Sequence, residues 1–315
     1  MESPIKVGNL LSFAKSFRNA QKQDLRLTVF VDPRSADEHI TALCDLLRPA
    51  TRRSQVFVQV MSGDVALDTA RLNSVRKSSA QVLLCARSAD IADLLPLPAA
   101  TCVVVGEELR SEAAGFLGLS ILDVVSFRSG DMQEQLADWL STSLSAKRLT
   151  LAADFSFVQK TVMRDILSAT AWQNAIIALV PFTHGADMPV LVANQVKMLF
   201  QLALASGLKL DLKRAPEVAV TGAAALGSRA LANRAFFPFP PARWLARGAI
   251  AFATTEALGR AACLYYEQLA AREREQALLT GAERRAVGGG VHLNPTQALL
   301  KLLGSGDTAA SATKA

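Results

Sequence analysis

Two hydrophobic patterns divide the chain. From residue 25 to about residue 144, short apolar runs of strand length alternate with segments of helical periodicity. Runs of this kind are typical of strands buried on both faces, and their alternation with helices predicts a mostly parallel sheet with helices on both faces. The predicted strands are Leu25–Val31, Gln55–Met61, Gln81–Ala86, Cys102–Gly106 and Ile121–Phe127, and the predicted helices are 36–47, 67–76 and 132–144.

Helical periodicity alone governs most of the remaining chain. Residues 149–166 are predicted to belong to the first helix of this part, which has no charge after Asp165 and ends before Pro181. A second apolar helix runs from Met188 to Gly207. Asp187 is placed to cap the second helix, and Gly207 fits the position just past its end. The sequence therefore predicts a helical hairpin. Two further helices are predicted at 218–232, where small residues favour close helix packing, and at 242–280, whose charged second half projects into solvent.

These patterns define a fold class and four segments. The fold class is α/β plus all-α, with a mostly parallel, Rossmann-like sheet that has helices on both faces, followed by a helical-hairpin domain. The predicted segments are an amphipathic, basic leading helix in 1–23, the α/β domain in 24–146, the helical domain in 147–284 and a flexible tail in 285–315. The tail contains a short amphipathic helix at 294–304, which either docks on a partner or folds back.

Several positions of the helical part resemble a known family. The string Gly185-Ala186-Asp187, the later Thr-x-x-Leu-Gly and the residues around them resemble the bacterial domain of unknown function 697, a helical domain often found beside or fused to small GTPase domains. The family has no established reaction, so the resemblance implies no catalytic residue. The positions that carry it are Arg164, Gly185, Asp187, Gln195, Lys197, Gly207, Thr255 and Gly259. We interpret Asp187 as a helix cap and place Thr255 and Gly259 at a close helix crossing.

The α/β part is similar in element order to the core of an Era-type GTPase domain, but its nucleotide motifs are degenerate. A phosphate-binding loop needs glycines, a lysine and a Ser or Thr. The first strand is instead followed by the segment 32–38, which has no glycine, no lysine and three carboxylates. The place that reads guanine holds Gly106-Glu107-Glu108-Leu109, and only Ser126 fits the last motif. The resemblance thus implies a pseudo-GTPase.

The carboxyl ends of parallel strands still form the edge where ligands tend to bind. Five polar residues follow the predicted strands at this edge: Asp32, Ser62, Asp64, Arg87 and Glu107. They are either ordinary loop residues and caps, or a cluster that binds a cation or a basic side chain of a partner.

Composition and charge narrow the possible functions. Half of the residues are apolar and 20% are charged, which excludes disorder for most of the chain, and the mean hydropathy of +0.24 leaves a membrane role open. The net charge of +6 favours anionic surfaces, but the basic residues are dispersed and aromatic residues make up only 6%, which argues against nucleic-acid binding. The four cysteines form no C-x-x-C pair and are predicted to be reduced, and the three histidines lie on different elements, so neither a metal nor a cofactor is predicted.

The leading hypothesis is a non-catalytic adaptor or scaffold that associates with a protein partner, for which a GTPase is a candidate, or with a membrane surface. One alternative is a GTPase-like regulator that binds a nucleotide or another ligand at the strand edges. Another is a membrane-embedded protein, because the span 166–186 is uncharged and long enough to cross a bilayer. Insertion is opposed by four residues of this span and by one in the middle of the next helix: Gln173, Asn174, Pro181, His184 and Lys197. Without the apolar core of a signal peptide, the expected location is the cytoplasm or the inner face of the cell membrane.

Overall fold

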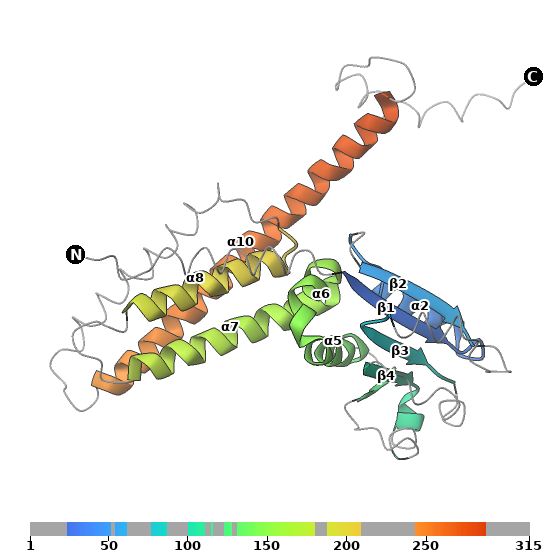
Figure 1. Ribbon diagram of the computed structural model, residues 1–315, viewed down its shortest axis with the longest axis horizontal. Coiled ribbons are helices and arrows are strands. Elements are labelled where there is room, and N and C mark those ends of the chain that lie inside the picture. The colour runs from blue at the N-terminus through green and yellow to red at the C-terminus, as the bar shows by residue number, and fades with distance from the viewer. Residues whose placement is uncertain are drawn as a thin grey trace, which may run out of the picture. The chain divides into compact units, whose positions relative to one another are not determined.

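A computed structural model describes residues 24–51, 54–61, 77–86, 100–110, 115, 123–127, 131–179, 188–208 and 243–287. The chain divides into two compact units, Met1–Tyr266 and Glu267–Ala315. The predicted boundary near residue 147 falls inside the first unit, and the four predicted segments remain predictions. The fold class is confirmed: a parallel α/β sheet precedes a group of helices (Figure 1).

The sheet contains five parallel strands in the order β2-β1-β3-β4-β5. This is the doubly wound order of flavodoxin-like folds, in which the chain first adds a strand on one side of β1 and then continues on the other. The strands are β1 (Leu25–Val31), β2 (Ser54–Val60), β3 (Ala80–Leu84), β4 (Ala100–Val105) and β5 (Val124–Ser126). Each overlaps its predicted run, and β1 matches residue for residue.

Burial explains why the inner strands read as continuous apolar runs. Every residue of β3 and β5 is buried, and β1 is buried apart from Arg26, so both faces of these strands are covered. The edge strand β2 differs, because Phe57, Val58 and Val60 are 45–58% exposed. Helix α2 (Asp37–Leu46) follows β1, and helix α5 (Met132–Ser143) follows β5.

The helical part is built from α6 (Arg148–Asp154), α7 (Ser156–Leu179), α8 (Met188–Ala205) and α10 (Arg243–Val287). One expectation is wrong: residues 149–166 do not form a single helix. Phe155 adopts an extended backbone, with φ −120° and ψ 107°, and separates α6 from α7. Its side chain is fully buried and packs edge-on against Phe157, so tertiary packing fixes a bend that the local pattern does not mark.

The hairpin α7–α8 has the predicted helix end. Gly207 follows α8 with φ +80°, and its N–H donates to the Leu204 carbonyl at 2.9 Å while that of Leu208 donates to the Ala203 carbonyl at 3.1 Å. A left-handed residue of this kind satisfies the last carbonyls of a helix, and glycine adopts it without steric strain.

Helix α10 packs closely on α7 in the antiparallel sense. A Cβ placed on Gly259 would lie 2.1 Å from Leu167 Cδ1, and one on Gly248 would lie 2.8 Å from Leu179 Cδ2. Both glycines therefore admit the neighbouring helix where a side chain would exclude it. This agrees with the predicted close crossing at Gly259.

Two side chains attach the helices to the amino edge of the sheet. Asp154 is buried at the end of α6 and accepts hydrogen bonds from the hydroxyls of Thr51, at 2.6 Å, and of Ser54. Lys147 donates to the Asp24 carbonyl at 2.9 Å and to Ser79 Oγ at 3.0 Å. Both of these anchoring contacts lie at the edge opposite the carboxyl ends of the strands.

Several predictions lie outside the described residues. They include the leading helix, the helix at 67–76, the small-residue helix at 218–232 and the tail helix at 294–304. Among the described residues, no helix combines the length and apolar character that crossing a bilayer requires.

Candidate functional site

The carboxyl edge of the sheet has its topological switch point between β1 and β3. The chain leaves β1 toward β2 on one side, while β3 pairs on the other side, so the connections diverge there. In open α/β sheets, ligands bind outside the strand ends at this point. Asp32, the first residue after β1, occupies it and is fully buried.

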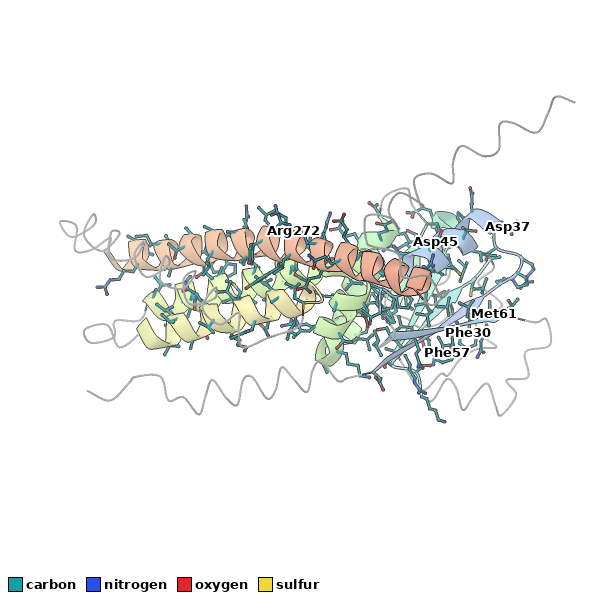
Figure 2. All side chains as sticks on the ribbon, turned by 90° about the horizontal axis from the view of Figure 1, so that it is seen from above. Phe30, Asp37, Asp45, Phe57, Met61 and Arg272 are labelled. Atoms are coloured by element: carbon teal, nitrogen blue, oxygen red, sulfur yellow. The ribbon has the colours of Figure 1, made fainter. Side chains whose placement is uncertain are left out.

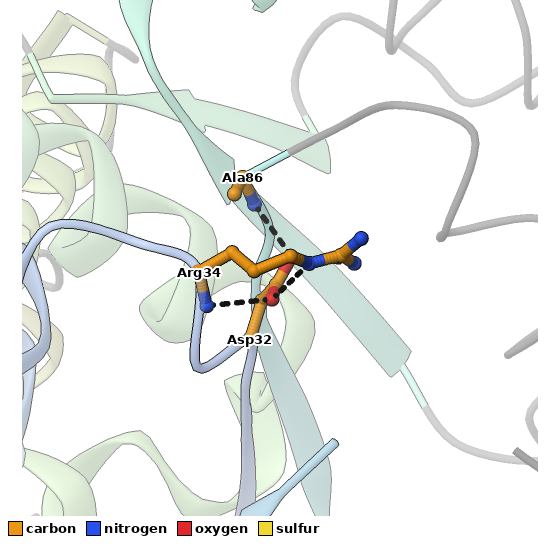
Figure 3. Close-up of polar contacts among 3 residues, drawn as sticks. All are labelled: Asp32, Arg34 and Ala86. Carbon is orange, nitrogen blue, oxygen red and sulfur yellow. Dashed lines mark hydrogen bonds and ion pairs between the residues drawn. The ribbon is translucent and has the colours of Figure 1, made fainter. Parts of the chain in front are cut away.

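The Asp32 carboxylate is held by its own loop and by the end of β3 (Figure 3). It accepts hydrogen bonds from the backbone N–H of Arg34 at 2.9 Å and from Arg34 Nε at 3.0 Å. Arg34 Nη2 donates at 3.2 Å, and the backbone N–H of Ala86 donates at 3.2 Å to the same oxygen, Oδ2. The carboxylate therefore links the ends of the neighbouring strands β1 and β3 at the switch point.

This arrangement keeps the carboxyl group ionised. Burial alone would raise the pKa of Asp32, but the hydrogen bonds from Arg34 and from the Ala86 backbone, together with the Arg34 charge, outweigh burial and lower that pKa. The Arg34 side chain remains 52% exposed, so the guanidinium forms the outer surface of the pair.

Two buried hydroxyl groups belong to the same edge. Ser35 is 9% exposed and Ser126 is fully buried. Within the described part of the chain, neither Ser35 Oγ nor Ser126 Oγ has a hydrogen-bond partner, which is unusual for a buried hydroxyl. His39 of α2 stacks on Phe127, which follows β5, with ring centroids 4.0 Å apart. This contact brings the start of α2 next to the end of β5.

The charges of this edge do not suit phosphate. Asp37 and Glu38 occupy the first turn of α2, and Glu107 begins the 3-10 helix Glu107–Leu109 after β4. These exposed carboxylates repel an anion where a helix N-terminus would otherwise attract one. Arg34 is already paired with Asp32. The edge therefore suits a polar or cationic group better than a nucleotide phosphate.

The predicted edge cluster is only partly placed by the structure. Asp32 and Glu107 lie at the carboxyl ends of β1 and β4, while Ser62, Asp64 and Arg87 are outside the described residues. The sequence did not single out Arg34 or Ser35. Their signal is the spacing, because a residue two positions after a strand-end aspartate can hydrogen-bond back to it.

A second polar cluster lies where α7, α8 and α10 meet. Asn174 Nδ2 donates to Thr255 Oγ1 at 3.0 Å, and Gln195 Nε2 donates to the same oxygen at 3.3 Å. Asn194 Nδ2 donates to Asn174 Oδ1 at 3.1 Å. Asn174, Gln195 and Thr255 are at most 8% exposed, so these bonds form a buried polar junction of three helices.

The junction contains two of the family-motif positions, Gln195 and Thr255. Its third buried member, Asn174, was considered from the sequence only as a polar residue that opposes membrane insertion. Its available signal was an amide in an otherwise uncharged helix. The junction contains no group that titrates near neutral pH, and each amide is oriented by another helix. Its geometry is that of a buried contact that fixes how the three helices pack against one another, rather than that of a reactive centre.

The other family-motif positions are dispersed. Arg164 forms ion pairs at 3.5 Å with Glu134 and Asp138 of α5, and Lys197 is exposed on α8. Gly207 and Gly259 have the backbone roles described above. Gly185 and Asp187 lie outside the described residues, so the capping role of Asp187 stays a prediction.

An exposed apolar strip runs along the seam between α7 and α10. Trp172 and Ile176 lie one turn apart on α7 and are 60% and 59% exposed, and Leu245 on α10 is 56% exposed. Phe252 stands seven residues after Leu245, two turns along α10, and packs edge-on against Trp172 with ring centroids 5.1 Å apart. We call these four residues the α7–α10 strip.

Cysteines and metal-ligating residues add no further site. None of the four thiols forms a disulfide, and burial, with Asp123 nearby, raises the pKa of Cys102 far above its ordinary value. The described residues contain no group of three or more potential metal ligands.

Comparison of the chain with protein-family models, curated proteins and solved structures found no match. The resemblances to the domain of unknown function 697 and to an Era-type domain therefore stay predictions.

Proposed function

We propose that the protein is a non-catalytic adaptor whose α7–α10 strip binds an anionic membrane surface from one side. The observation that carries this proposal is the exposure of Trp172, Ile176 and Leu245 along one seam, with Phe252 packed against the tryptophan. Tryptophan and aliphatic side chains on an amphipathic helical surface insert at the level of the lipid headgroups.

The charges around the strip support an anionic surface. The helix segments 166–179, 188–205 and 243–255 contain no carboxylate, and their charged residues are Lys197, Arg243 and Arg247. Basic residues on the helices of this part add electrostatic attraction to acidic lipids. Since the segments lie on three helices joined by the polar junction, the strip belongs to a rigid element rather than to a flexible peptide.

Co-sedimentation of the full-length protein with vesicles tests the proposal. We expect binding to vesicles of phosphatidylcholine and phosphatidylglycerol, weaker binding to phosphatidylcholine alone, and release by high salt. The double variant Trp172→Ala/Ile176→Ala should bind at least about tenfold more weakly, because each side chain contributes about 1.5–3 kcal/mol when buried. Leu264→Ala is the matched control, because Leu264 is 63% exposed but is not part of the strip.

Three outcomes would contradict the proposal. Absence of binding to acidic vesicles would redirect the strip to a protein partner, for which an intact GTPase is the first candidate to test. Equal loss of binding in the Leu264→Ala control would show that membrane binding does not depend on the α7–α10 strip. Extraction by detergent but not by salt would favour inserted helices over surface binding.

A second candidate function rests on the carboxyl edge. The buried hydroxyls of Ser35 and Ser126 are polar groups without a partner in the described part of the chain, and both follow or end strands at the carboxyl edge where α/β folds bind ligands. A regulator that binds a small polar ligand there would show a ligand-dependent rise in melting temperature. Screening nucleotides, amines and polyols by thermal shift tests it, and Ser126→Ala should abolish any rise that this site produces.

A further inference from the structure

We propose that the protein forms a two-fold symmetric dimer through strand β2, which pairs antiparallel with β2 of a second copy and joins two sheets into one. Among the described strands, β2 pairs with β1 alone and forms the end of the sheet (Figure 1). An edge strand presents unpaired backbone N–H and C=O groups, which are a template for another strand.

The sequence of strand β2 lacks two features that commonly protect an edge. Its sequence, SQVFVQV, contains no charged residue and no proline. Phe57, labelled in Figure 2, is 45% exposed, and Val58 and Val60 are 52% and 58% exposed. Successive side chains of a strand point to opposite faces, so apolar surface is open on both faces of this edge. Such exposure is expected where the sheet continues into another strand.

The second copy is indicated by the symmetry of the strand itself. Residues 55–59 read Gln-Val-Phe-Val-Gln, which is the same in both directions. When two antiparallel copies are centred on Phe57, each Phe57 faces the other, each Gln55 faces Gln59 of the second copy, and each Val56 faces Val58. A two-fold interface requires this kind of self-complementary surface.

The hydrogen-bonding directions of the backbone fit the same register. The N–H of Met61 donates to the Val31 carbonyl of β1 at 2.8 Å, so Met61 points toward β1. Because the direction alternates along a strand, Gln55, Phe57 and Gln59 also point toward β1. Ser54, Val56, Val58 and Val60 then point outward.

Centring on Phe57 pairs outward residues only with outward residues. Ser54 meets Val60 of the second copy, and Val56 meets Val58. Each such pair exchanges two bonds, which gives about eight backbone hydrogen bonds across the dimer. Phe57 meets its counterpart in a pair without mutual hydrogen bonds, where side chains approach most closely.

The first test is the mass of the full-length protein in solution, measured by sedimentation over a wide concentration range. We expect a dimer of about twice 33.6 kDa at high concentration. Val58→Pro should give the monomer, because proline removes an outward N–H while leaving the bonds to β1 in place. Val58→Thr is the matched control, since it keeps the N–H and the branched shape, and it should remain dimeric.

Cross-linking tests the register independently of folding defects. Phe57→Cys should form a disulfide between copies under mild oxidation, because the facing Cα atoms would lie about 4.5 Å apart. Gln55→Cys alone should not, since its counterpart would be about 14 Å away, but a mixture of Gln55→Cys and Gln59→Cys should cross-link. Mass spectrometry identifies each bond against the four native cysteines.

A monomer at every concentration would overturn the proposal. So would a dimer that survives Val58→Pro, or one in which Gln55→Cys cross-links to itself as readily as Phe57→Cys, because either result assigns the contact to another surface or register.

Discussion

At the scale of single residues, the fate of a polar group depends on the partners that the fold brings to it. Asp32 was predicted as a ligand candidate because it follows a buried strand, and the structure places it at the carboxyl edge as expected, with the strand order making that place the switch point. Its carboxylate is nevertheless saturated by Arg34 and Ala86. Thr255, in contrast, is one of two neighbouring threonines in a helix, and only it meets amides from two other helices.

The lowered pKa of Asp32 makes a prediction about pH. A carboxyl group whose pKa is lower in the folded state stabilises the protein above its unfolded pKa, and this contribution is lost as the pH falls through the folded pKa. Asp32→Asn should therefore reduce the free energy of unfolding at pH 7 by about 1–3 kcal/mol, and the difference from wild type should shrink below about pH 3.8.

Urea unfolding at pH 7 and pH 3 measures this difference. Asp45→Asn, an exposed carboxylate on α2, serves as the control and should change stability by at most about 0.5 kcal/mol. A loss for Asp32→Asn that is equal at both pH values would show that the loop geometry matters and the charge does not.

The polar junction makes a second prediction at this scale. Thr255→Val keeps the side-chain shape but leaves the amide donors of Asn174 and Gln195 without their acceptor, so unfolding should require about 2–4 kcal/mol less. Thr255→Ser should restore most of the loss. The adjacent Thr254, whose hydroxyl donates to Ile250 of its own helix at 2.8 Å, is the matched control, and Thr254→Val should have little effect. Equal stabilities for the two valine variants, measured by thermal unfolding, would contradict the role of the junction.

At the scale of elements, local pattern predicts existence and type well but not every boundary. Three predicted elements match the structure almost to the residue: 25–31 is β1, 132–144 is α5 and 188–207 is α8. Their signals are local, because a continuous apolar run marks the strand, helical periodicity marks the helices, and Gly207 marks the end of α8. The bend at Phe155 was missed, since no proline or glycine marks it. A buried aromatic ring decides it, and burial is not a local property.

Close packing between α7 and α10 predicts that a glycine-to-alanine substitution in α10 lowers the stability of the protein, whereas such a substitution usually stabilises a helix. Gly259→Ala would stabilise an exposed helix by about 1 kcal/mol through helix propensity. Here the new methyl group would meet Leu167 Cδ1 at 2.1 Å, so we expect destabilisation by about 1–3 kcal/mol.

A double-mutant cycle with Leu167→Ala measures this contact. In the shortened Leu167→Ala background, Gly259→Ala should be neutral or stabilising, because the obstructing methyl is gone. Additive effects of the two substitutions would show that the two helices can separate without cost, and would contradict the close crossing.

At the scale of the whole molecule, the two parts of the first unit are joined through buried polar contacts at the amino edge of the sheet. Asp154 of α6 binds the hydroxyls of Thr51 and Ser54 immediately before and at the start of β2, and its carbonyl accepts the N–H of Ala50 at 2.8 Å. The helices are thereby held at one edge, which leaves the carboxyl edge and the outer side of β2 to other contacts.

This attachment predicts coupling between α6 and β2. Asp154→Ala should destabilise the protein by about 1–3 kcal/mol, because the hydroxyls of Thr51 and of the buried Ser54 lose their acceptor. Hydrogen exchange should accelerate first at the N–H groups of Gln55 and Phe57, which point toward β1, and less in α8. Asp165→Ala on the exposed side of α7 is the control. Unchanged exchange in β2 would contradict the coupling.

The sequence by itself determined the class of most elements, the parallel sheet and the helical hairpin, because these follow from periodicity, turn residues and side-chain chemistry within a few positions. It also contained the symmetric run of β2, but its meaning depended on the strand order. Only the tertiary structure decided that β2 lies at the edge, that Arg34 neutralises Asp32, and that Asn174, Gln195 and Thr255 meet. These facts depend on contacts between residues far apart in the chain, and such contacts form only when the whole core is buried.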